Sequence, residues 1–171
     1  EAVNDSKLDV EKEDKDRSGV IIGSGIGGIT TLTLEAMGYS EGGRVPRFNP
    51  FMIPKMIPDI AAGLVSIKYG LRGPNYATVS ACASSCHAMI NAFDLIRLGK
   101  ADVILTGGSE AGISIQSVGG FNSAQALSVK NEDYLTASRP FDKTRDGFVM
   151  GEGAGILIFE EYERAVARGA K

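Results

Sequence analysis

Tryptophan is absent from the chain, which also contains only one histidine and two cysteines. Two cysteines, Cys82 and Cys86, are too few for the disulfide framework of a small secreted protein. With a single histidine they also fall short of a zinc site, so we expect no bound metal. No apolar run reaches the roughly 18 residues that a membrane-spanning helix needs. We therefore expect no membrane span.

The chain also has little excess of one charge over the other. The net charge is −3, and residues 1–18 hold seven acids and four bases, which accounts for all of it. The remainder is balanced, so we expect no nucleic-acid partner. A length of 171 residues with ordinary apolar content allows one domain with a sizeable core. Because the chain starts at Glu1 and its last helix has no natural stop, we expect a piece of a longer protein.

Glycine is plentiful, with 22 residues that gather in loops, as in a layered α/β fold with many tight turns. We expect residues 1–18 to form a surface helix end and a solvated loop, and residues 38–50 to form another loop. Apolar runs and turn signals predict strands over 19–22, around 78–79, over 101–106 and over 154–159. They predict helices over 29–37, 59–69, 83–98, 122–127 and 160–168.

Cys82 lies where a predicted strand gives way to a predicted helix. The helix is indicated by Met89, Phe93 and Ile96, which recur at helical spacing, and Gly99 fits its C-terminal cap. A thiol at a helix N-terminus faces unpaired backbone N–H groups, which favour the thiolate and can stabilise an oxyanion. The pattern therefore indicates a nucleophile. Spacing alone leaves open a buried structural cysteine, which is the commoner role.

The segment Ser80-Ala-Cys82-Ala-Ser-Ser resembles the nucleophile motif of the elongating β-ketoacyl-acyl carrier protein synthases, the condensing enzymes of fatty acid synthesis. The resemblance runs in order through nearly the whole chain. It continues in Gly70-Leu-Arg-Gly-Pro74, Asp102-Val-Ile-Leu-Thr-Gly-Gly-Ser-Glu110, Gly119-Gly-Phe121, Arg139-Pro-Phe-Asp-Lys-Thr-Arg-Asp-Gly-Phe-Val149 and Gly151-Glu-Gly-Ala-Gly155.

This resemblance implies a thiolase-like layered αβαβα fold, of which residues 1–171 are an incomplete N-terminal half. It implies that Cys82 is the catalytic nucleophile and that Ile26 and Phe121 bind substrate. Ile26 would meet the growing chain and Phe121 would border the acyl tunnel, although Phe121 could instead be simple core. The family's two catalytic histidines come from a later part of the chain, so we expect residues 1–171 alone to be inactive in condensation.

The reaction implied is a decarboxylative Claisen condensation of malonyl-carrier protein with an acyl thioester on Cys82. The implied partners are acyl carrier protein, acyl and malonyl thioesters and a second copy in a homodimer, with no cofactor, in a bacterial cytoplasm or an organelle. Many relatives have Arg at the position of Gln125, which weakens the expected carrier-docking patch, although Arg44 and Arg47 could contribute. Two alternatives remain, a polyketide ketosynthase module and a non-catalytic chain-length-factor-like scaffold.

Two glycine-rich motifs resemble nucleotide-binding loops only superficially. The run Gly23-Ser-Gly-Ile-Gly-Gly28 matches a dinucleotide fingerprint, but no strand ending in an acid follows at the required distance. Gly151-x-Gly-x-Gly155 enters a strand and lacks a helix N-terminus for a phosphate. We expect neither NAD nor flavin.

Three further polar residues have plainer interpretations. His87 lies roughly 140° around the helix from Cys82, so we expect a packed or hydrogen-bonded core group and not a partner of the thiol. Cys86, in the helix interior, is predicted to be an inert packing residue. Glu110 is expected to be a buried acid that backbone donors satisfy, although a functional carboxylate is the alternative.

Overall fold

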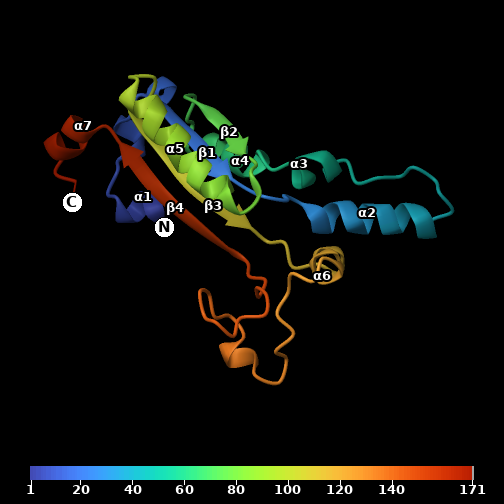
Figure 1. Ribbon diagram of the computed structural model, residues 1–171. Coiled ribbons are helices and arrows are strands. Elements are labelled where there is room, and N and C mark those ends of the chain that lie inside the picture. The colour runs from blue at the N-terminus through green and yellow to red at the C-terminus, as the bar shows by residue number, and fades with distance from the viewer. Residues whose placement is uncertain (171) are drawn as a thin grey trace.

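A four-stranded sheet forms the centre of the computed structural model, which describes residues 1–170 (Figure 1). Its strands lie in the order β2-β1-β3-β4. Parallel pairing joins β1 to β2 and to β3, and antiparallel pairing joins β3 to β4. The strands are β1 (Ser18–Gly23), β2 (Asn75–Thr78), β3 (Val103–Glu110) and β4 (Gly153–Glu160).

Helices cover both faces of the sheet. Helix α4 (Ile60–Tyr69) packs on one face, and α5 (Ser84–Arg97) packs on β1 and β3 from the other. An arm formed by α2 (Ile29–Glu41) and α3 (Met52–Met56) extends beyond the end of β1, and α6 (Ile115–Ser123) lies below it in the view of Figure 1. Helices α1 (Ala2–Asp5) and α7 (Tyr162–Ala167) lie at the opposite end. None of these helices, within the described residues, is long and apolar enough to cross a membrane.

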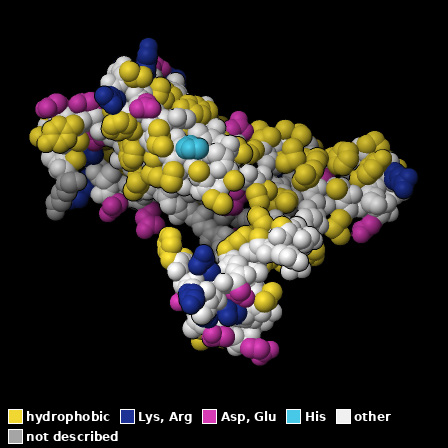
Figure 2. Space-filling model, viewed as in Figure 1, with side chains coloured by type: hydrophobic (Ala, Val, Ile, Leu, Met, Phe, Trp, Pro, Cys, Tyr) yellow, Lys and Arg dark blue, Asp and Glu magenta, His cyan; other side chains and the backbone are white. Residues whose placement is uncertain are grey.

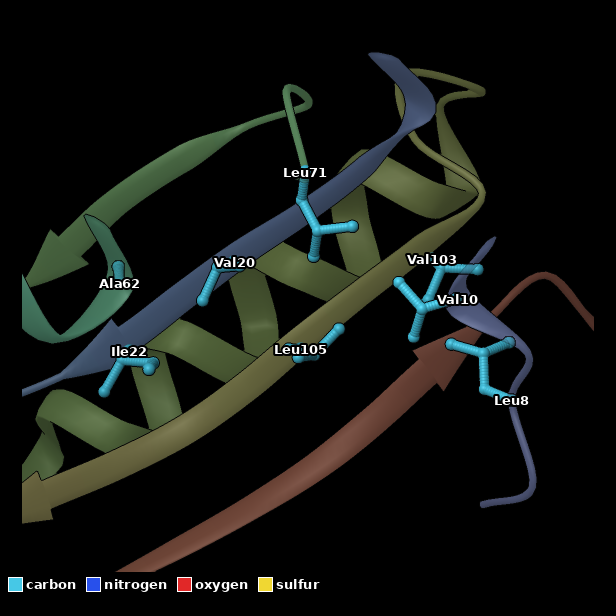
Figure 3. Close-up of a cluster of buried hydrophobic side chains, with 8 residues drawn as sticks. All are labelled: Leu8, Val10, Val20, Ile22, Ala62, Leu71, Val103 and Leu105. Atoms are coloured by element: carbon cyan, nitrogen blue, oxygen red, sulfur yellow. The ribbon is translucent and has the colours of Figure 1, made fainter. Parts of the chain in front are cut away.

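The core consists of two layers because side chains alternate along the central strands. Val20 and Ile22 point to the side of α4, with Val103 and Leu105 of β3 beside them (Figure 3). The side chain of Ile21 points to the other face, where Ile104, Ala88 and Ala92 surround it. Because both faces of β1 are covered, its sequence is a continuous apolar run without polar alternation. The strands predicted over 19–22, 101–106 and 154–159 are confirmed.

The surface helix expected near the N-terminus is present as α1, but the segment after it is not the solvated loop that we expected. Leu8 and Val10 are buried and complete the core layer on the α4 side (Figure 3). Arg17 forms a two-point ion pair with Asp102, with both N–O distances at 2.6 Å. The prediction was wrong because charged residues surround the two apolar side chains and mask their pattern.

Two predicted helix boundaries also change. Helix α2 continues to Glu41, four residues into the region 38–50 that we expected to be loop. The helix predicted over 122–127 is wrong, since α6 covers Ile115–Ser123 and includes Phe121. The Ser114 side chain accepts a hydrogen bond from the Ser117 N–H at 3.1 Å and caps the start of α6. Gln125, with φ of 54°, lies just beyond its end.

Candidate active site

The chain turns sharply between β2 and α5, and Cys82 lies in that turn. Residues Ala81–Ala83 form a single 3-10 turn, and α5 begins at Ser84. The Cys82 side chain is exposed, so the reading of a buried structural cysteine does not hold in this chain. The first N–H groups of a helix have no acceptor within it. Cys82 therefore combines access from solvent with the positive end of a helix dipole.

Two glycines let the start of α5 come unusually close to the sheet. A Cβ atom on Gly23, at the end of β1, would lie 2.5 Å from the Ser84 carbonyl oxygen and the Ser85 amide nitrogen. A Cβ atom on Gly108 of β3 would lie 2.6 Å from the Ser85 Cβ. The helix N-terminus is thus wedged against the carboxyl ends of two parallel strands, where open α/β sheets place their ligands.

A cavity of about 680 Å³ opens beside this turn. Its lining includes Cys82, Ile26 and Phe121, the three residues that the sequence analysis singled out. These residues come from three separate segments, the turn before α5, the loop after β1 and helix α6. The volume lies within the range of small-molecule sites. A thiol at the rim of such a space can react with a ligand whose apolar part fills it.

Phe148 is a lining residue that the sequence analysis missed. Its ring meets the Phe121 ring edge to face, with centroids 5.1 Å apart and planes at 82°. Both rings lie outside the two core layers, so simple core packing does not describe Phe121. Phe148 reaches Phe121 because its backbone bonds to Ala126 and Ser128 across a long loop. No local sequence signal reveals that pairing.

The same loop is fixed by a carboxylate beside Phe148. The Ser128 hydroxyl donates to the Asp146 carboxylate at 2.7 Å, and the Val129 N–H donates to it at 3.1 Å. The hydrogen bond from Ser128 holds the pKa of Asp146 below its usual value. In the same segment, the Asp142 carboxylate accepts hydrogen bonds from the hydroxyl and the N–H of Thr144, and both bonds lower the pKa of Asp142. These bonds position the segment that carries Phe148.

Glu110 holds the loop that carries Ile26. Its carboxylate accepts hydrogen bonds from the N–H groups of Gly25, Ile26 and Gly27 at 2.5, 2.8 and 3.2 Å. The expectation that backbone donors satisfy this acid is confirmed, although the side chain is half-buried. Three consecutive N–H groups around one carboxylate explain why the run Gly23–Gly28 turns so tightly here. The backbone N–H groups of this run therefore bind the side-chain carboxylate of Glu110.

His87 and Cys86 are exposed, so neither is a core group as expected, although His87 does form a hydrogen bond. The His87 Nδ1 atom lies 2.6 Å from the Ser80 hydroxyl, so its hydrogen-bond partner among the described residues is Ser80 and not Cys82. Both residues lie on the side of α5 that turns away from the sheet, where the single histidine is visible among apolar side chains (Figure 2). Exposed apolar residues of α5 include Ile90 and Phe93.

The two basic candidates of the docking patch, Arg44 and Arg47, are exposed in the loop between α2 and α3. Over residues 1–170, no three His, Cys, Asp or Glu side chains come together in a way that could hold a metal ion.

Solved structures similar to this fold include ketosynthases. The ketosynthase of a type II polyketide system, solved with its acyl-carrier protein and bound to a hexaketide, superposes with a TM-score of 0.94 at 34% identity. The match covers 99% of this chain and 43% of that one. The prediction of an α/β fold of the thiolase-like kind is confirmed.

The family model for the β-ketoacyl synthase N-terminal domain matches residues 1–165, so the chain belongs to the β-ketoacyl synthase family. It is 52% identical over 171 residues to 3-oxoacyl-[acyl-carrier-protein] synthase 2 of Synechocystis. It is 49% identical over 170 residues to the synthase of the same name from Staphylococcus aureus. The chain spans 41% of the first relative and 42% of the second.

Proposed function

We propose that this chain is the nucleophile-bearing part of a β-ketoacyl-acyl carrier protein synthase that elongates fatty acids. The observation that carries the proposal is the placement of an exposed thiol, Cys82, in the 3-10 turn that leads into α5 and in the lining of the 680 Å³ cavity. Ile26 and Phe121 line the same cavity and are proposed to contact the acyl chain.

The proposed reaction has two stages. First, the Cys82 thiolate attacks the carbonyl carbon of an acyl-carrier thioester, and the carrier thiolate leaves and takes up a proton. Second, a malonyl thioester loses carbon dioxide, and the resulting carbanion attacks the carbonyl of the Cys82 thioester. The Cys82 thiolate leaves, and the product is a β-ketoacyl thioester two carbons longer. A covalent intermediate thus divides one difficult reaction into two easier ones.

The backbone N–H of Cys82 is proposed as one donor to the oxyanion of each tetrahedral intermediate. By family resemblance, decarboxylation depends on two histidines, whereas this chain contains only His87, which bonds to Ser80. We therefore propose that residues 1–171 alone accept an acyl group but do not condense it.

Acyl carrier protein and a second subunit are the proposed partners. Two bacterial relatives are named 3-oxoacyl-[acyl-carrier-protein] synthase 2, and one structural neighbour was solved with its carrier protein. Strand β2 lies at the edge of the sheet and pairs only with β1 among the strands of the described residues. Its free edge is suited to pair with the same strand of another copy. We propose a homodimer that forms through this edge.

A polyketide ketosynthase is the second candidate, because the structural neighbour with a TM-score of 0.94 comes from such a system. The chain is 52% identical to the Synechocystis synthase but 34% identical to this polyketide ketosynthase, and the difference favours fatty acid elongation. A chain-length-factor-like scaffold would need no nucleophile, and the intact, accessible Cys82 argues against it.

The two cysteines provide the test of the nucleophile. Both are exposed and lie one helical turn apart, so a difference in their reactivity reports their position in the helix. Limited iodoacetamide is expected to alkylate Cys82 before Cys86, and an acyl-carrier thioester is expected to acylate Cys82 alone, as measured by peptide mapping. Cys86→Ser should keep the acylation and Cys82→Ser should abolish it. Acylation at Cys86 would contradict the assignment.

Condensation is tested in a chimera in which residues 1–171 replace the matched segment of the Synechocystis synthase. The chimera is expected to release β-ketoacyl product, and the chimera with Cys82→Ser is expected to release none. Product from residues 1–171 alone would refute the need for the remaining sequence.

A further inference from the structure

The residue before the nucleophile adopts an unfavourable backbone conformation. Ala81 has φ of 50°, in the left-handed region that residues with a Cβ atom seldom enter. Such a conformation persists only where the surrounding structure enforces it. Because Ala81 directly precedes Cys82, its backbone angles determine where the chain places the Cys82 side chain after β2. Other groups must therefore hold Ala81 in this conformation.

Ser84 makes hydrogen bonds that can hold the turn in this conformation. Its hydroxyl donates to the Ala81 carbonyl at 2.7 Å and accepts from the Ser80 N–H at 2.9 Å. One oxygen thus bridges the two residues that precede Cys82. Ser84 is 4% exposed, so water is poorly placed to replace these bonds. A serine at a helix start usually caps the helix N–H groups, whereas this hydroxyl reaches back to the turn.

Ser84 is itself held rigidly by its surroundings. The Ser84 carbonyl accepts a hydrogen bond from the Thr78 hydroxyl at 2.7 Å, which ties the helix start to the end of β2. From the other side, the backbone of β1 at Gly23 comes so close that no Cβ atom fits between the strand and Ser84. Ser84 therefore has little freedom to follow the turn if the turn relaxes.

We propose that Ser84 is a positioning residue for the nucleophile. Its hydroxyl holds Ala81 in the left-handed conformation, and this keeps Cys82 at the helix N-terminus and at the rim of the cavity. The proposal rests on the proposed function only in taking Cys82 as the reactive thiol. Without the hydroxyl, Ala81 relaxes to a negative φ and the thiol moves out of the field of the helix N–H groups.

The test is Ser84→Ala, read as the ratio of initial iodoacetamide alkylation rates at Cys82 and Cys86. We expect the ratio to fall about fivefold or more, the population change that the strain at one such residue allows. General loosening of the protein affects both thiols alike and leaves the ratio near its original value. The matched control is Ser18→Ala, which removes another buried hydroxyl that donates to a backbone carbonyl, that of Asp14, at 2.8 Å. It lies at the far end of β1 and should leave the ratio unchanged.

Rescue by glycine separates positioning from general support of the fold. Glycine adopts a positive φ without steric cost, so Ala81→Gly added to Ser84→Ala should return the ratio to within about twofold of the ratio in Ala81→Gly alone. If Ser84→Ala does not fold, this comparison of the double and single glycine variants decides. A ratio unaffected by Ser84→Ala, a lack of rescue, or a double variant that does not fold overturns the proposal. A Cys82 that is unreactive in the unmodified protein would instead refute the proposed function.

Discussion

Gly23→Ala is expected to damage the junction that presents Cys82, the proposed nucleophile. The added Cβ atom would meet the Ser84 carbonyl oxygen and the Ser85 amide nitrogen at 2.5 Å. Neither atom can rotate aside, because both belong to the backbone of α5. Strand β1 cannot retreat either, since its residues are buried between β2 and β3. The helix start must therefore move away from the sheet.

The cost of this movement can be estimated from overpacked cores, which lose about 1–3 kcal/mol. Because the clash involves backbone on both sides, we expect the upper end, about 3 kcal/mol. For a chain of this length, that corresponds to a fall in Tm of roughly 6–12 °C. The displacement also carries the turn with Cys82, so its alkylation rate should fall relative to that of Cys86.

Thermal unfolding followed by circular dichroism measures the first effect, and peptide mapping after limited alkylation measures the second. The matched control is Gly63→Ala in α4, because nothing lies within 4 Å of the position where its Cβ would be. Alanine in a helix interior should raise stability there by about 0.5–1 kcal/mol. If Gly23→Ala is as stable as the original protein, the close contact between β1 and α5 is not the constraint we describe.

Three further predictions concern polar groups. Thr106 is fully buried and its hydroxyl has no hydrogen-bond partner within residues 1–170, so Thr106→Val should raise the free energy of unfolding in urea by about 1 kcal/mol, and a loss would contradict the missing partner. The hydrogen bond from Arg17 lowers the pKa of Asp102, so the stability advantage over Asp102→Asn should be complete at pH 7, shrink below about pH 4 and vanish in stronger acid; a difference in Tm that does not depend on pH would refute the ion pair. Glu110→Gln replaces a carboxylate oxygen with a donor that faces the N–H groups of the Ile26 loop, so we expect a loss of about 1.5–3 kcal/mol in the same urea assay, and a neutral result would show that this loop does not depend on the charge.

The central strands and helix α5 could be predicted because local pattern and tertiary role agree. Val20, Ile21 and Ile22 are apolar because both faces of β1 are covered, and the run is visible without knowledge of its neighbours. In α5, Ala88 and Ala92 face the sheet while Cys86 and His87 face away. The apolar stripe of Met89, Phe93 and Ile96 predicted the helix correctly. It did not predict which side is buried, because the sheet-facing residues of this helix are small.

The errors arose where distant residues decide a local structure. Leu8 and Val10 are buried only because core residues from across the chain meet them. Helix α6 starts at the Ser114 cap and tolerates two adjacent glycines that weaken the helical signal. The site itself joins Ile26, Cys82 and Phe121 from three elements, which no spacing rule connects. Their grouping came from the family resemblance, and Phe148 came from the structure alone.

The two ends of the chain depend on each other. Arg164 pairs with Glu13, and Arg168 donates to the Ser6 carbonyl at 3.0 Å, so contacts span more than 150 positions. During synthesis on a ribosome, the first residues must wait for these arginines for roughly 8–30 seconds at usual elongation rates. Over that interval Leu8 and Val10 have an incomplete core to join. The opening segment is therefore the part of this chain for which a chaperone has the longest time to act.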